Sequence, residues 1–328
     1  MPSEPTSPDV RPGSGLVLGD DPVAALEAAS WALAAMIGTM REALTAPVAD
    51  VLATAPERTA VLEAVGLVTR EHGGLTLHPS LRDATGQTAV GAVEAKLSSL
   101  RQAVSAAAAP VAHDAANGGW AGLDDEVLLN QGRASAVTGH ALATKIVPQL
   151  TGLADRLGTA DGRILDVGTG VAALAVALAR AFPRAHVVGI DILDRVLDLA
   201  RIELAGAGDA AGRVSLRRQD VAELAEHAAY DLVWLPAPFL TEAALSAALP
   251  RAIDALRPGG WMVVGTNPAS PDSLLRAVGR WTAVLHGGNS YDTERMAATL
   301  TASGLRETRR FPTVKGGPVL VAARSPQG

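Results

Sequence analysis

Cysteine is absent from the 328-residue sequence, and aromatic residues make up only 3% of it. The lack of thiols excludes disulfides, cysteine nucleophiles and thiolate zinc sites. The seven histidines are scattered without an H-x-x-x-H pair, so no metal site is predicted. Basic charge is also in deficit, since the formal net charge is −6. This balance disfavours a general attraction to nucleic acid or to anionic membranes.

Long hydrophobic runs are missing as well. No uncharged apolar run reaches the roughly 20 residues that span a bilayer. Residues 1–20 are rich in Pro, Ser and Gly and lack the basic start and apolar core of a signal peptide, so we expect a flexible tail. The sequence therefore predicts a cytoplasmic protein. Its 48% hydrophobic content suffices for one large or two ordinary packed domains.

The N-terminal part carries helical patterns. Residues 21–44 have helical periodicity, with Asp21 as a plausible N-cap before Pro22. Two shorter helices and two short strands are predicted up to residue 78, an order typical of a winged helix, and a long linking helix over 89–109. Residues 47–85 contain three arginines against five acidic side chains, whereas phosphate contact needs a basic face. We therefore expect a packing or dimerisation module at 21–110.

The C-terminal half alternates strand and helix signals. Strands are predicted at 163–168, 185–191, 214–220, 230–236, 261–267, 306–311 and 318–324. Helical segments separate the first five, which predicts an α/β fold: a doubly wound, mainly parallel sheet with helices on both faces. The last two strands are joined only by the short connection "PTVKGG", which favours an antiparallel hairpin at a sheet edge.

The stretch "LDVGTG" ends the first of these strands and carries Asp166, Gly168 and Gly170. The two glycines permit positive φ and a close approach of ligand atoms to the backbone. Asp166 would repel a pyrophosphate but attract the ammonium group of S-adenosylmethionine. A dinucleotide fingerprint also has a third glycine where this sequence has Ala173.

Two further acids end the next strands. Asp191 is placed to accept hydrogen bonds from ribose hydroxyls, and Asp220 from an adenine amino group. Each of these positions also has a plain structural alternative. The glycines would serve equally to close a tight turn, and the two acids to cap the helices that follow them.

Residues 163–324 resemble a class I S-adenosylmethionine-dependent methyltransferase. The stretches "LDVGTG", "GIDI", "RQDV", "YDLVWLP" and "LRPGGWMVVG" match successive motifs of that family. The resemblance implies a Rossmann-like seven-stranded sheet at 161–328 and S-adenosylmethionine as cofactor. The cofactor contacts that it implies are Asp166, Gly168, Gly170, Asp191, Ile192, Asp220 and Val221.

The N-terminal part resembles the dimerising, winged-helix-type domain of small-molecule O-methyltransferases. That likeness implies a homodimer, with residues 111–160 as a linker and helices that cover the cofactor. Members of the family often place a His-Asp pair after the fourth strand, but Pro238 stands where the histidine would be. The candidate bases are therefore His140, His286 and Tyr291, each of which has a packing or loop-anchoring alternative.

The polar cluster "NQGRAS" at 130–135 stands out in an Ala/Leu-rich region. Arg133 is placed to pair with the cofactor carboxylate or with an acidic substrate. We expect Gln131 to contact the cofactor as well and Asn130 to contact the substrate, unless the cluster merely begins a helix. An apolar substrate wall is predicted from three aromatic residues that packing would also explain, namely Trp234, Phe239 and Trp281.

These observations favour methyl transfer from S-adenosylmethionine to a small-molecule acceptor, a specialised metabolite, with O-methylation preferred. N-methylation, C-methylation and methylation of a peptide stay open because the His-Asp pair is missing. Three other classes of protein compete with this interpretation. They are a nicotinamide-dependent oxidoreductase, a transcriptional regulator that senses the cofactor, and a protein that binds S-adenosylmethionine without catalysis.

Overall fold

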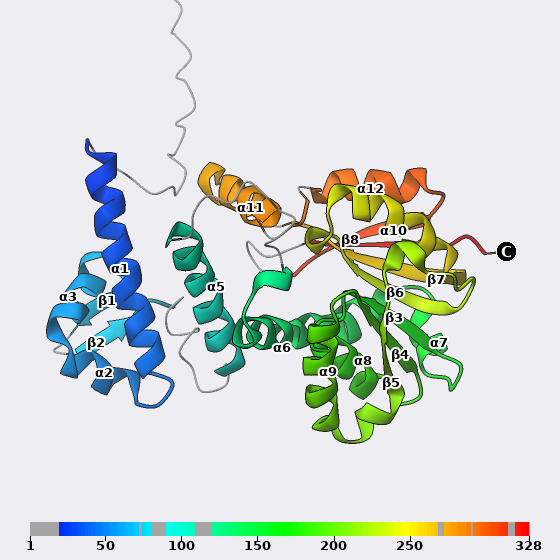
Figure 1. Ribbon diagram of the computed structural model, residues 1–328, viewed down its shortest axis with the longest axis horizontal. Coiled ribbons are helices and arrows are strands. Elements are labelled where there is room, and N and C mark those ends of the chain that lie inside the picture. The colour runs from blue at the N-terminus through cyan, green and yellow to red at the C-terminus, as the bar shows by residue number, and fades with distance from the viewer. Residues whose placement is uncertain are drawn as a thin grey trace, which may run out of the picture.

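The structure is a computed structural model that describes residues 20–71, 74–79, 90–108, 120–267, 272–285, 287–289, 291–313 and 319–327. Figure 1 shows two parts joined by helices. A small helical region from the N-terminal part of the chain (blue) lies at one end of the molecule. A large sheet with helices on both faces forms the other end, and the helices α5 and α6 lie between the two.

In its described residues, the N-terminal region has three helices and a two-stranded antiparallel sheet before α5. Its elements are α1 Pro22–Glu42, α2 Val48–Thr54, α3 Pro56–Ala64, β1 Val68–Glu71 and β2 Gly74–Leu77. Asp21 caps α1 as predicted, because its side chain accepts hydrogen bonds from the amides of Val23 and Ala24. The element order agrees with the sequence prediction, whereas the assignment as a winged helix stays a prediction.

The core of this region is small. One cluster of buried side chains joins Ala35 of α1 to Leu52, Leu62 and Val68. A second joins Met40 to Leu97 of the long helix α5 (Val90–Ala108). Among the described residues, α1 is also the one helix long and apolar enough to cross a membrane by length and composition, a test that core helices of soluble proteins pass too.

A short series of helices leads from α5 to the sheet. It consists of the single turn η2 Trp120–Gly122, α6 Asp125–Ala141, the π-turn η3 Leu142–Ile146, η4 Val147–Gln149 and α7 Leu153–Leu157. The polar cluster at 130–135 therefore lies inside α6 and does not begin a helix. The domain boundary predicted near residue 110 falls outside the described residues.

The sheet has seven strands in the order β5-β4-β3-β6-β7-β9-β8. Its strands are β3 Arg163–Val167, β4 His186–Asp191, β5 Val214–Arg218, β6 Tyr230–Pro236, β7 Leu256–Gly265, β8 Arg306–Pro312 and β9 Val319–Arg324. The first five run parallel, and β9 pairs antiparallel with both β7 and β8. The predicted parallel sheet with an antiparallel hairpin at its edge is confirmed.

Helices cover both faces of this sheet. They are α8 Ala173–Ala181, α9 Asp194–Ala205, α10 Glu242–Asp254 and α12 Thr293–Ala302, with short turns η5 Gly208–Arg213, η6 Val221–Glu223 and η7 Ala237–Phe239. Apart from them, α11 Ser273–Leu285 lies away from the sheet (Figure 1) and has exposed apolar side chains. Alternate residues of β6 enter opposite cores. Leu232 and Trp234 pack with α7 and α8, and Val233 and Leu235 pack with α10 and α12.

A buried ion-pair cluster holds the amino-terminal ends of the central strands. Asp231, whose side chain is only 3% exposed, accepts hydrogen bonds from Arg257 at 2.8 Å and from Arg156 at 3.4 Å. It also accepts from the backbone amide of Arg163 at 3.0 Å. The cluster fixes β3 against β6 at the end of the sheet opposite to the glycine turn.

Candidate functional site

The turn after β3 adopts an alternating left-handed backbone. Gly168 and Gly170 have φ values of 63° and 57°, which glycine adopts without steric cost. Ala172 also has a positive φ of 63°, and it begins α8 as the N-cap residue. An alanine in this conformation is strained by about 1 kcal/mol. Backbone amides at such a turn are exposed to a ligand beyond the strand ends, where open α/β sheets bind their ligands.

Asp166 lies directly beneath this turn. Its side chain is 1% exposed and accepts a hydrogen bond of 2.7 Å from the hydroxyl of Thr169. Burial and the nearby carboxylate of Asp191 raise the pKa of Asp166, and the hydrogen bond from Thr169 lowers it. The net result is a pKa of about 7. The site therefore holds a buried acid that a cationic group would convert to its charged form.

Asp191 ends β4 and ties it to the glycine turn. One carboxylate oxygen accepts from the amide of Gly170 and the other from the amide of Leu193, both at 3.1 Å. Burial raises the pKa of Asp191, while hydrogen bonds from three backbone amides oppose this shift. Asp191 is thus both a brace for the turn and an acceptor at the strand end, where the sequence predicted contact with a ribose.

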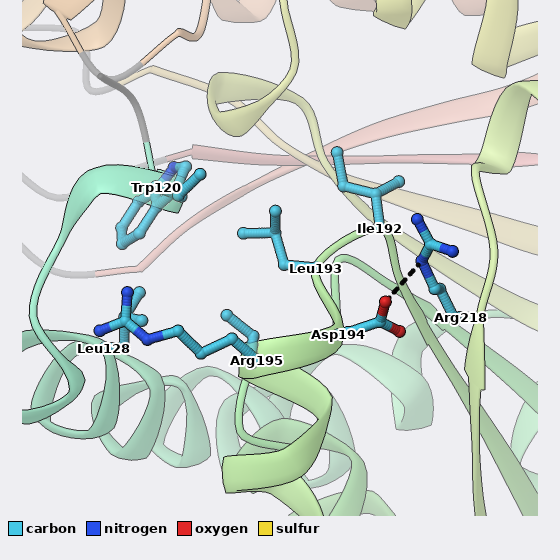
Figure 2. Close-up of a pocket in the computed structure, with 9 residues that line it drawn as sticks. Trp120, Leu128, Ile192, Leu193, Asp194, Arg195 and Arg218 are labelled. Carbon is cyan, nitrogen blue, oxygen red and sulfur yellow. Dashed lines mark ion pairs between the residues drawn. The ribbon is translucent and has the colours of Figure 1, made fainter. Parts of the chain in front are cut away.

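A pocket of about 280 Å³ opens beside Asp191. It is lined by Ile192 and Leu193 from the β4 end, by Arg218 from the β5 end, and by Trp120 and Leu128 from the opposite side. Figure 2 shows these side chains facing one another across the pocket, with Asp194 paired to Arg218 at its edge. This volume lies near the lower limit for small-molecule sites, which suits one part of a ligand that extends along the strand ends.

Ile192 is 59% exposed toward this pocket, in agreement with the predicted contact to an adenine ring. Asp220 and Val221 follow β5. Asp220 is exposed and accepts from the amide of Ala222 at 2.8 Å, so it caps η6. Val221 is 6% exposed and packs in the core beside α10. The structure thus gives both residues a structural role, and their contact with adenine stays a prediction.

Helix α6 covers the glycine turn through two of its glycines. A Cβ atom at Gly132 would come within 2.5 Å of the Val171 side chain, and one at Gly139 within 2.8 Å of Ala177. Close packing against α8, which the sequence did not reveal, therefore explains two helix-breaking residues inside α6. It also places the N-terminal half of α6 over Val171 and the turn.

The polar side chains of α6 have partners on adjacent helices. Arg133 forms a bidentate ion pair with Glu203 of α9, at 2.7 and 3.0 Å, and its pairing with a cofactor or substrate carboxylate stays a prediction. Asn130 donates to the hydroxyl of Ser98 on α5 at 3.1 Å. Both side chains thus connect α6 to an adjacent helix, because each finds a hydrogen-bond partner there. Gln131 is half-buried on the same helix, and its contact with the cofactor stays a prediction.

The three residues of the predicted substrate wall differ strongly in exposure. Trp234 is 7% exposed and packs within the core on the α8 face of the sheet. Trp281 is 62% exposed on α11. Phe239 lies in η7, directly after β6, and is 55% exposed. Of the three, Phe239 is the residue that the structure places at the end of a central strand with an open face.

The candidate bases receive little support from geometry. His140 is exposed on the last turn of α6, about 12 Å along the helix from Gly132 at 1.5 Å per residue. Tyr291 is 9% exposed, packs in the core, and lies under the guanidinium of Arg295 at 3.7 Å. It therefore anchors its loop. His286 falls outside the described residues.

Two residues of the site were missed by sequence reasoning. Trp120 lines the pocket, and its ring contacts that of Phe239 edge-on at 5.1 Å. Asn289 is 4% exposed and donates to the carbonyls of Ala237 and Leu240, at 2.7 and 2.8 Å, so it fixes the segment after β6. The scarcity of aromatic residues was a signal for Trp120, whereas nothing in the sequence pointed to Asn289.

The residues at the strand ends fit S-adenosylmethionine by their chemistry. Two carboxyl groups, the buried Asp166 and the half-buried Asp191, have no arginine or lysine partner among the described residues, and the ligand brings an ammonium, a sulfonium and ribose hydroxyls. The turn with Gly168 and Gly170 leaves space for its methionine part. The pocket beside Ile192 is apolar enough for its adenine.

Comparisons with known proteins agree with this geometry. A family profile described as a methyltransferase domain matches residues 164–260. No curated protein matches the sequence. An O-methyltransferase family protein from Burkholderia thailandensis has a similar structure, with a TM-score of 0.66 and 16% identity, covering 93% of this chain and 98% of that one.

Two further solved structures are similar over nearly their whole length. The S-adenosylmethionine-dependent methyltransferase SibL has 21% identity and a TM-score of 0.62, with 95% of this chain and 100% of that one covered. CalO1, a methyltransferase in calicheamicin biosynthesis, was solved with S-adenosylhomocysteine. It has 19% identity and a TM-score of 0.60, with coverage of 93% and 95%. The chain thus has the fold of these proteins, and residues 164–260 form a methyltransferase domain, as the sequence motifs predicted.

Proposed function

We propose that the protein transfers a methyl group from S-adenosylmethionine to an oxygen atom of a small-molecule acceptor. The observation that carries the proposal is the pair of carboxyl groups, the buried Asp166 and the half-buried Asp191, around the left-handed turn at Gly168 and Gly170. The turn fits a ligand that brings positive charge and hydroxyl donors without phosphates. The methyltransferase domain match and the fold support the same conclusion.

When bound, the cofactor supplies an electrophilic methyl group on a sulfonium, and it leaves as the neutral thioether S-adenosylhomocysteine. The protein's task is to hold the acceptor in line with that group and to exclude water. Helix α6 covers the turn from one side, through its contact at Gly132. Phe239, at the end of β6, offers an apolar face on the other side of β3.

The described residues place no histidine among those that line the pocket or follow β6. We infer that the acceptor hydroxyl is acidic enough to lose its proton to solvent as the new bond forms, because a general base is needed only for weakly acidic groups. The same observation keeps N-methylation as the second candidate. An amine attacks through its free electron pair and loses its proton afterwards.

Calorimetric titration with S-adenosylhomocysteine, with NAD run in parallel, tests the cofactor. We expect micromolar binding of the first and none of the second. Binding of NAD alone would refute the proposal. Incubation with S-adenosylmethionine and a panel of phenols, acidic enols and amines, followed by mass spectrometry, then tests the reaction. Methylation of amines but not of hydroxyl compounds would favour the second candidate.

We also propose a cytoplasmic homodimer. The N-terminal residues 21–110 would serve as the dimerisation domain, residues 111–160 as the cofactor cover and residues 161–328 as the cofactor domain. Exposed apolar side chains on two helices support a dimer, namely Val23, Leu26 and Trp31 on α1 and Leu274, Leu275, Val278, Trp281 and Val284 on α11. The small core of the N-terminal region supports it as well.

Light scattering measures the oligomeric state directly. We expect a dimer at micromolar concentration, which Trp31→Glu weakens because the tryptophan side chain is 71% exposed in the single chain. Lys96→Glu on the exposed side of α5 is a control for the charge change. A monomeric full-length protein would contradict this proposal without affecting the proposed chemistry.

A further inference from the structure

One side chain, Trp120, borders two different parts of the site. It begins the single turn η2, five residues before α6, and its ring lines the pocket opposite Ile192 and Leu193 (Figure 2). Its ring also meets that of Phe239 with a centroid separation of 5.1 Å and an interplanar angle of 75°. This edge-to-face arrangement is the one that aromatic pairs prefer.

The two neighbours of Trp120 belong to different strands. Ile192 follows β4 and Phe239 follows β6, and β3 with its glycine turn lies between those strands. Adjacent strands are about 4.8 Å apart, so the two strand ends are separated by about 10 Å. Trp120 therefore extends across the turn, from the side of the pocket to the side on which an acceptor would lie.

Phe239 cannot shift freely to follow the indole. Asn289 holds the carbonyls on both sides of it, those of Ala237 and Leu240. A Cβ atom at Gly288 would come within 1.9 Å of the Pro238 carbonyl, so the loop behind η7 is in direct backbone contact with it. The Phe239 ring is thus presented from a fixed segment.

The segment that carries Trp120 is attached on the side of the pocket. Asp125, at the start of α6, pairs with Arg195 of α9 at 2.6 Å, and Arg195 lines the same pocket. A ligand that fills the pocket would touch the indole on one side while Phe239 touches it on the other. Filling of the pocket by a ligand would therefore stabilise the contact between the rings of Trp120 and Phe239.

We propose that Trp120 is a positioning residue that couples occupancy of the cofactor pocket to the aromatic wall of the acceptor site. This inference rests on the proposed function. With the cofactor bound, the indole packs between it and Phe239, and the wall is complete. Without it, the indole loses one of its two supports. The acceptor is accordingly expected to bind after the cofactor.

A double-mutant cycle tests the coupling without knowledge of the acceptor. The affinity for S-adenosylhomocysteine is measured by calorimetry for wild type, Trp120→Leu, Phe239→Leu and the double variant. Phe239 does not line the pocket, yet we expect Phe239→Leu to weaken binding by about twofold to tenfold, the range for aromatic pairs. We expect the double variant to bind no more weakly than Trp120→Leu alone.

Three controls make the result specific. Trp120→Phe keeps an aromatic ring at this position and should restore most of the affinity and of the coupling to Phe239. Ile202→Ala removes an apolar side chain that is 70% exposed on α9 and has no role in the site, and it should leave the affinity unchanged. Thermal unfolding of every variant shows that the fold is retained.

The outcomes separate the two proposals. Additive effects of the two substitutions, or an unchanged affinity in Phe239→Leu, would overturn the coupling while leaving the cofactor assignment intact. Failure of the wild-type protein to bind S-adenosylhomocysteine would overturn the proposed function and the coupling with it. Loss of affinity in Phe239→Leu that disappears in the Trp120→Leu background is the result that supports the inference.

Discussion

The central strands bury carboxyl groups at both of their ends, but the two ends satisfy them differently. At the amino-terminal end, Asp231 is paired with Arg156 and Arg257. At the carboxyl-terminal end, Asp166 accepts from a threonine hydroxyl and Asp191 from backbone amides, with no cationic partner among the described residues. A paired buried acid supports the fold, whereas an uncompensated one costs stability and is available for a cationic ligand.

The largest effect is expected at the paired end. Asp231→Ala leaves two arginines without their shared partner and the amide of Arg163 without its acceptor. We expect a loss of about 3 kcal/mol in the free energy of unfolding, measured in urea. The folded variant should keep its affinity for S-adenosylhomocysteine, because Asp231 lies at the opposite end of the sheet. A loss below about 1 kcal/mol would show that the pairing has little structural value.

Asp191→Ala should act on the ligand instead. It removes an ionised acceptor at the strand end and leaves the amide of Gly170 without its carboxylate partner. Hydrogen bonds to charged groups contribute about 1.5–3 kcal/mol, so the affinity for S-adenosylhomocysteine should fall by about tenfold to a hundredfold. Asp292→Ala, which removes an exposed cap at the start of α12, is the matched control. Equal affinities of wild type and Asp191→Ala would refute the ribose contact.

Asp166 should make the stability of the ligand-free protein depend on pH. Its pKa is raised from 3.8 to about 7, so the folded state favours the protonated form. The contribution of Asp166 to stability is then most favourable below pH 4, falls as pH rises toward 7, and levels off above that. Asp166→Asn should flatten this slope in thermal unfolding. A smaller slope should remain because the pKa of Asp191 is raised as well. An unchanged slope would contradict the assignment.

The same carboxyl group should release a proton when a ligand ammonium binds near it. Titration with S-adenosylhomocysteine at pH 6.5 in two buffers of different ionisation enthalpy measures this release directly. We expect it in wild type and not in Asp166→Asn.

The smallest effect is expected for Arg133→Ala. The Arg133–Glu203 pair is partly exposed, with side-chain exposures of 48% and 27%, so its loss should cost less than about 1 kcal/mol. The affinity for S-adenosylhomocysteine should change by less than twofold. A tenfold loss of affinity would show that Arg133 contacts the cofactor, as the sequence predicted, in spite of its ion pair with Glu203.

The sequence was informative where local chemistry and chain order coincide. The strands, the hairpin at the sheet edge and the turn at Asp166–Gly170 were predicted because strand periodicity, glycine and acid positions are all local signals. The ion pair of Arg133 was not predictable, because its partner Glu203 is 70 residues away. Trp120 and Asn289 were missed for the same reason, since each acts through residues distant in the chain.

The close packing of α6 at Gly132 and Gly139 has a consequence for mutational tolerance. A larger side chain collides with Val171 of the turn at Gly132 and with α8 at Gly139, so substitutions there separate the cover from the cofactor turn whatever their polarity. Trp281 on α11 carries no such constraint, because it is 62% exposed. In a library of random variants Gly132 and Gly139 should be depleted of changes while Trp281 accumulates them. Acceptor preference is therefore free to diverge on a cofactor cover that stays invariant.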